Sequence, residues 1–119
     1  MIHHMKLNPQ PFEMIKAGDK TIELRLNDEK RQQIKIGDRI TFSNTLEPAL
    51  TIHAEVLKLH FFPGFHELYE SLPLEKCGYL PEETAAASAD DMLAYYTIEQ
   101  QNRFGVVGIE IQVIATDKQ

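Results

Sequence analysis

The chain has 119 residues, the length of one ordinary domain, with 43% hydrophobic and 25% charged residues. Its net charge of −6 argues against DNA as a partner and against broad, non-specific binding of nucleic acid, and its single cysteine excludes an intramolecular disulfide. No apolar run is long enough for a signal peptide or a membrane span. We therefore expect one domain over residues 1–119, in the cytoplasm and without a membrane partner.

The first third of the sequence predicts two strands with a helix between them. Residues 2–7 are predicted to form a short strand. Residues 11–17 predict a helix, because Pro11 suits a first turn and Gly18 suits the position just past the end. Residues 20–26 alternate between apolar and polar side chains, which is typical of a strand with two different faces.

The two faces of this strand differ sharply. The apolar face holds Ile22, Leu24 and Leu26, and the polar face holds Thr21, Glu23 and Arg25. A polar face on an antiparallel strand is ordinarily solvent surface. Two details favour a site instead. Lys20 lies on the apolar parity, where desolvation lowers the pKa of a lysine. Glu23 and Arg25, about 7 Å apart on one face, can hold two ends of a polar ligand.

The rest of the chain predicts three more strands and two helices. Residues 39–44 and 49–62 form strands, and a change of apolar parity after Val56 predicts a bulge. Residues 65–72 have the apolar spacing of a helix. After a second helix, residues 106–114 form the last strand.

That second helix begins at Ser88, a suitable cap, and carries a row of larger side chains along one side. The row consists of Met92, Tyr95, Tyr96 and Glu99. We expect one of the two tyrosines to lie in the core. The other is then free to stack on a base or to donate its hydroxyl.

The order of these elements limits the fold. Strands and helices are not regularly interleaved, which argues against a doubly wound parallel sheet. We expect an α+β, mainly β fold: a small mixed or antiparallel barrel with about three flanking helices around a cleft.

Catalytic and metal motifs are weak throughout the chain. The five histidines lack the spacing of a metal site, and Cys77 has no base near it in sequence. No glycine-rich phosphate loop is present either. We therefore expect no metal and no cofactor.

The opening segment carries a recognisable pattern. Gly18, Lys20, Thr21, Glu23 and Arg25 give G-x-K-T-x-E-x-R, and a Gly-Asp turn at residues 37–38 then enters a strand. The late segment YYTIEQQNRFGVVGIEI places a tyrosine-bearing helix before the last strand. Together these motifs resemble the ASCH domain of the PUA-like superfamily, over residues 5–114. The resemblance implies a PUA-like β-barrel with helices around a cleft.

The resemblance also implies a function linked to RNA or nucleotides. Some small bacterial relatives are amidohydrolases that deacylate N4-acetylcytidine with a lysine, a threonine three residues later and a glutamate from a later loop. Lys20 matches that lysine, whereas Glu23 stands in place of the threonine. Glu82 and Glu83 are candidates for the later glutamate by position. This departure places the chain nearer the broader E-x-R type.

Three hypotheses follow for the polar segment 18–25. The first is a module that binds RNA or a modified nucleoside. Its expected ligand-binding residues are Thr21, Arg25, Asp28, Arg31, Tyr95 and Glu99. The second is a small amide hydrolase acting on acylated nucleosides, or a ribonuclease-like enzyme, with Lys20 and Glu23 as catalytic residues. The third is a structural or interaction domain whose polar face is ordinary surface. The oligomeric state is left open.

Overall fold

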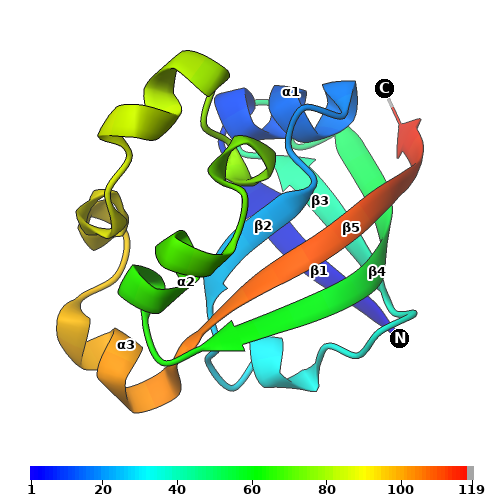
Figure 1. Ribbon diagram of the computed structural model, residues 1–119. Coiled ribbons are helices and arrows are strands. Elements are labelled where there is room, and N and C mark those ends of the chain that lie inside the picture. The colour runs from blue at the N-terminus through cyan, green and yellow to red at the C-terminus, as the bar shows by residue number, and fades with distance from the viewer. Residues whose placement is uncertain (118–119) are drawn as a thin grey trace.

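The computed structural model describes residues 1–117, and its core is one five-stranded sheet (Figure 1). The strands are β1 (Ile2–Leu7), β2 (Ile22–Leu26), β3 (Arg39–Asn44), β4 (Thr51–Phe62) and β5 (Val106–Asp117). Their order in the sheet is β1-β3-β4-β5-β2. β1 and β3 are parallel, and the other neighbouring strands are antiparallel. The predicted mixed α+β architecture is confirmed.

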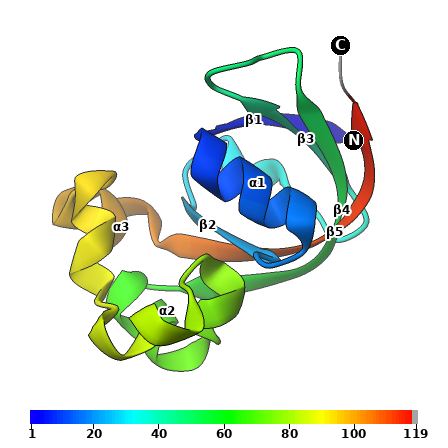
Figure 2. The same cartoon turned by 90° about the horizontal axis from the view of Figure 1, so that it is seen from above.

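The sheet is strongly curved but does not close (Figure 2). β1 and β2 are its two edges, and within residues 1–117 no strand ladder joins them. We call the gap between these edges the seam. One side chain spans it, because Arg25 Nη2 donates to the Lys6 carbonyl oxygen at 2.8 Å. The molecule is therefore a barrel left open along one line.

The long strand β4 bends where the sequence predicts a bulge. Its register against β5 shifts between Val56 and Lys58, and a further shift lies between His53 and Ala54. An extra residue in one strand increases the local twist. β4 and β5 thereby run from the barrel to the helices beside it (Figure 1).

Helices lie on both sides of β2 and β5 (Figure 2). The α-helices are α1 (Pro9–Ala17), α2 (Phe65–Ser71) and α3 (Ile98–Phe104). Four short 3₁₀ helices are η1 (Arg31–Gln33), η2 (Leu74–Cys77), η3 (Pro81–Ala86) and η4 (Ala89–Ala94). α1 sits in the concave side of the sheet and ends, as predicted, at Gly18, which has a φ of +87°. No helix in residues 1–117 has the length and apolar character needed to cross a bilayer.

The single helix expected from Ser88 through Glu99 is wrong. Ser88 caps η4, which ends at Ala94. The helix α3 starts separately, after Thr97. The Thr97 hydroxyl accepts a hydrogen bond from the Gln100 amide, which satisfies one of the free donors at the helix start. Tyr95 and Glu99 therefore belong to different elements.

The strand β2 lies between two hydrophobic cores. Ile22, Leu24 and Leu26 pack against the helices, in a cluster with Phe65, Leu68 and Val106. Glu23 and Arg25 pair in register with Ile109 and Val107 of β5, which belong to the barrel core. Paired residues of an antiparallel ladder point to the same side. The polar face of β2 thus points toward the barrel core, and Glu23 is buried there. The interpretation of that face as ordinary solvent surface is wrong.

Candidate functional site

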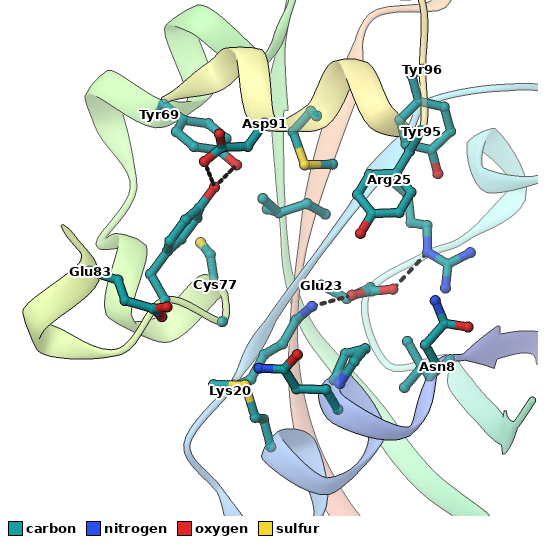
Figure 3. A pocket seen from close by; sticks show the side chains of 18 of the residues that line it. Asn8, Lys20, Glu23, Arg25, Tyr69, Cys77, Glu83, Asp91, Tyr95 and Tyr96 are labelled. Carbon is teal, nitrogen blue, oxygen red and sulfur yellow. Dashed lines mark hydrogen bonds and ion pairs between the residues drawn. The ribbon is translucent and has the colours of Figure 1, made fainter. Parts of the chain in front are cut away.

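A cavity of about 480 Å³ runs along the free edge of β2 (Figure 3). We call it the main cavity. One wall comes from the start of α1 and the residues before it, the floor from Lys20 and β2, and the opposite wall from the segment 69–96. Ligand sites in proteins commonly measure roughly 300–1,000 Å³. The main cavity falls within this range.

Three charged side chains form the floor of the main cavity. Glu23 is 4% exposed. Its Oε1 lies 2.7 Å from Lys20 Nζ, and its Oε2 accepts from Arg25 Nε at 2.7 Å. Both carboxylate oxygens are therefore bound by cations, in the geometry of strong charge-assisted hydrogen bonds.

The surroundings keep Glu23 ionised. Burial by itself raises the pKa of this carboxyl, but the charges of Lys20 and Arg25 and their hydrogen bonds outweigh burial, and the pKa is lowered. The floor therefore carries one negative and two positive charges at neutral pH.

This arrangement differs from the two expectations drawn from strand parity. Strand spacing suggests that Glu23 and Arg25 lie about 7 Å apart, whereas in the structure their side chains pair directly. Lys20 joins them from the opposite parity because β2 begins only at Ile22. The backbone amide of Lys20 still donates to Met14 of α1, so Lys20 belongs to the connection between α1 and β2.

A glycine makes room for the lysine stem. A Cβ atom built on Gly78 would lie 3.3 Å from Lys20 Cδ. Gly78 also has a φ of +112°, which strongly favours glycine. The end of η2 thus closes over Lys20 because no side chain intervenes.

Tyrosines dominate the wall opposite α1. The hydroxyls of Tyr69 and Tyr79 lie 2.7 Å apart, and Tyr79 donates to Asp91 Oδ2 at 2.7 Å. Since Tyr79 has only one hydroxyl proton, Tyr69 donates to Tyr79. Burial is the largest factor that raises the pKa of both phenols. Both therefore stay neutral hydroxyls.

The adjacent tyrosines divide as the sequence predicts. Tyr96 packs against the helix-side core and stacks on Phe65, with ring centroids 5.9 Å apart. Tyr95 is 67% exposed and lines the main cavity on the same side as Arg25 (Figure 3). One ring is structural, and the other is available to a ligand.

The thiol beside the floor is unreactive. Cys77 is buried, and burial raises its pKa to about 11, although the charge of Lys20 lowers it. A cysteine acts as a nucleophile in its thiolate form. The geometry gives Cys77 a packing role.

The structure brings only some of the sequence-predicted site residues together. Lys20, Glu23, Arg25 and Tyr95 meet at the main cavity. Of the two later glutamates, Glu83 lines the cavity and Glu82 is exposed. The Glu83 carboxylate already accepts a hydrogen bond from the Leu80 amide, which caps η3.

The other four predicted residues lie outside the main cavity. They are Thr21, Asp28, Arg31 and Glu99. Thr21 bonds through its backbone to Lys76 and Ile111, and Glu99 is exposed on α3. Asp28 holds Arg31 in the turn after β2.

Sequence reasoning missed several residues of the cavity wall, namely Asn8, Tyr69, Tyr79 and Asp91. The apolar spacing of residues 65–72 predicts Tyr69 to be a core residue, and Asp91 lies in the first turn after the cap Ser88. No spacing rule connects either residue to Lys20. Within residues 1–117, no three His, Cys, Asp or Glu side chains are grouped to hold a metal ion.

Comparison with known proteins gives one family. The sequence profile of the ASCH domain matches residues 5–115. No curated protein matches the chain.

Solved structures extend this result. The crystal structure of the hypothetical protein PH0355 is 34% identical, covers 96% of this chain and all of its own, and superposes with a TM-score of 0.78. Protein PF0455 from Pyrococcus furiosus is 33% identical over 96% of this chain and 98% of its own, with a TM-score of 0.70. The S128A mutant of ZmASCH from Zymomonas mobilis is 14% identical. It covers 98% of this chain and 73% of its own, with a TM-score of 0.66, and shows a shared fold.

Proposed function

Because the chain belongs to the ASCH domain family, we propose that it binds a nucleoside, free or within RNA, in the main cavity. The observation that carries this proposal is the position of the ionised Glu23. It lies between Lys20 and Arg25 on the floor of a ligand-sized cavity, and the exposed ring of Tyr95 lines the same cavity. RNA binding is the function generally associated with this family.

The floor offers hydrogen-bonding groups that suit the edge of a base. An ammonium has three donors, and Lys20 uses one of them on Glu23. Arg25 uses Nε on Glu23 and Nη2 on Lys6, which leaves further guanidinium donors. These donors suit a carbonyl oxygen, and the remaining lone pairs of Glu23 suit an exocyclic amine. Cytosine presents both groups on one edge, on either side of the ring nitrogen N3.

The wall offers the face that a base requires. Single-stranded RNA is commonly recognised by stacking unpaired bases on aromatic side chains. The Tyr95 ring is exposed, whereas Tyr69, Tyr79 and Tyr96 already have partners in the wall. Tyr95 is therefore the stacking residue that we propose.

Amide hydrolysis of acylated cytidines is the second candidate, favoured by the direct contact of Lys20 with Glu23 at the cavity floor. Two features rank it below binding. A lysine ammonium held by a carboxylate has no lone pair with which to accept a proton. A carboxylate whose pKa is lowered is also a weak general base.

Calorimetric titration tests the first proposal. We expect cytidine or a short RNA to bind the wild-type protein and Tyr95→Ala to weaken binding about tenfold, because stacking on one aromatic ring contributes roughly 1–3 kcal/mol. Tyr95→Phe keeps the ring and is the control, with affinity close to wild type. Binding that is unaffected by Tyr95→Ala, or no binding to any nucleoside or RNA, would contradict the proposal.

The same samples test the second candidate. Each is incubated with N4-acetylcytidine, and the products are separated by liquid chromatography. Turnover that disappears in Lys20→Ala would establish an enzyme. Binding without turnover would leave the binding module.

A further inference from the structure

A second cavity of about 320 Å³ lies on the other side of Arg25, at the seam of the barrel. We call it the seam cavity. Its polar lining consists of His4, Lys6, Arg25, Lys30, Arg31 and Ser43. These residues come from β1, β2, β3, the turn that holds Lys30 and the start of η1 at Arg31. Lys6 and Ser43 are direct partners in the β1–β3 ladder. The lining is therefore built by the fold and not by one flexible loop.

The seam cavity is positive although the chain as a whole is negative. Within residues 1–117, no carboxylate lies within 4.0 Å of the amine of Lys6 or of Lys30. Arg31 Nη1 pairs with Asp28 Oδ2 at 3.3 Å, and Arg25 and Lys20 both pair with Glu23. A cleft lined by one sign of charge concentrates ions of the opposite sign. The cavity is thus suited to an anion.

One donor in the lining has no partner. The Nε atom of Arg31 is buried and has no hydrogen-bond partner among the described residues. The backbone amide and Nη1 of Arg31 both donate to Asp28, which fixes the guanidinium in place. A buried polar group without a partner is rare in folded proteins and is costly. An unsatisfied guanidinium donor adds to the positive character of the lining.

The two cavities share a boundary. Arg25 and Lys6 line both of them, and the Arg25 guanidinium is bonded to the Lys6 carbonyl between them. A ligand that places a base in the main cavity can therefore extend past Arg25 into the seam cavity. The group that follows the sugar in a nucleotide is a phosphate, and guanidinium groups bind phosphate well.

We propose that the seam cavity binds the phosphate attached to the nucleoside in the main cavity. The preferred ligand is then a nucleotide, or a nucleotide unit of RNA, and not an unphosphorylated nucleoside. The identity of the base rests on the function proposed above, whereas the phosphate site rests on the seam cavity alone.

Inorganic phosphate tests the seam cavity without any base. We expect a phosphate titration to shift the Arg31 Nε–Hε signal in ¹⁵N-correlated spectra at constant ionic strength. Chloride at the same ionic strength is the control and should leave the signal in place. A signal that moves equally with both salts, or with neither, would overturn the phosphate site.

Substitution tests the link between the cavities. We expect Lys30→Gln to weaken binding of cytidine 5′- or 3′-monophosphate about tenfold, since a hydrogen bond to a charged group contributes at least that factor. Cytidine itself should bind Lys30→Gln as it binds the wild type. Lys58→Gln, at an exposed lysine of β4, changes the net charge equally and should alter neither affinity.

A third set of ligands distinguishes a phosphate within RNA from the phosphate of a free nucleotide. A dinucleotide and a short RNA present a phosphodiester, whereas the monophosphates present a monoester. For RNA, Lys30→Gln should reduce the slope of log affinity against log salt by about one. Equal losses for cytidine and its phosphates would overturn the inference. Phosphate binding without any nucleoside binding would instead refute the proposed function and keep the phosphate site.

Discussion

At the scale of single residues, the charge of Glu23 links the stability of the floor to pH. Glu23→Gln leaves Lys20 and Arg25 without their counter-charge and should lower the free energy of unfolding at neutral pH by about 3–5 kcal/mol. Glu99→Gln, at an exposed glutamate, is the matched control and should change it little. Urea denaturation measures both.

The pH dependence follows from the direction of the pKa shift. The folded pKa of Glu23 is below its ordinary value of 4.5, so its stabilisation is complete above that pH. It is lost as pH falls through the folded pKa. The difference between wild type and Glu23→Gln should therefore shrink on acidification below pH 4.5. A difference that stays constant down to about pH 3 would contradict this assignment.

Residue types alone predicted part of the site. The G-x-K-T-x-E-x-R pattern identified Lys20, Glu23 and Arg25, which the structure brings together. Tyr79 and Asp91 were missed because they approach Tyr69 only through the fold of η2–η4, which has no apolar period. Short-range patterns cannot predict contacts of this kind.

At the scale of elements, alternation in β2 predicted two faces but not which face would point into the barrel. An edge strand normally has one wet face. Here Ile22, Leu24 and Leu26 are covered by helices that start only at Phe65, so Glu23 and Arg25 face the barrel. The direction depends on those helices, and nothing within residues 20–26 specifies it.

The sequence carries a signal for the split between η4 and α3. Thr97 and Gln100 form a capping box, in which each side chain bonds the other residue's backbone amide. The apolar row from Met92 onward suggested continuity instead. Two caps nine residues apart, at Ser88 and Thr97, indicate two helices.

The contact between Gly78, at the end of η2, and Lys20 can be tested by substitution. Gly78→Ala and Gly37→Ala both place a side chain at positive φ, which should cost about 1–2 kcal/mol each. Only the Cβ at position 78 meets Lys20, since Gly37 has open space around it. We expect Gly78→Ala alone to weaken nucleoside binding in calorimetric titration. Equal nucleoside affinity of the two variants would contradict a role of η2 in the binding site.

At the scale of the whole molecule, stability should be uneven. β4 and β5 share the longest ladder, whereas η3 and η4 have no fully buried residue. Amide exchange should therefore be slowest in β4–β5 and fast in residues 81–94. A bound nucleoside should slow exchange in residues 91–96, a segment in which Asp91, Met92, Tyr95 and Tyr96 line the main cavity, and should leave the exposed loop 45–49 unchanged. Mass spectrometry of exchanged peptides measures both. No slowing in residues 91–96, or equal slowing in both segments, would contradict the site.

The pairing of β2 with β5 has a consequence for co-translational folding. Ile22 pairs with Glu110 and Leu26 with Val106, so β2 has no partner among the described strands until β5 has left the exit tunnel. Until then Glu23 lacks the ladder that turns it toward the barrel. The floor of the main cavity, encoded before most of the sheet, is therefore assembled only after β5 has been translated.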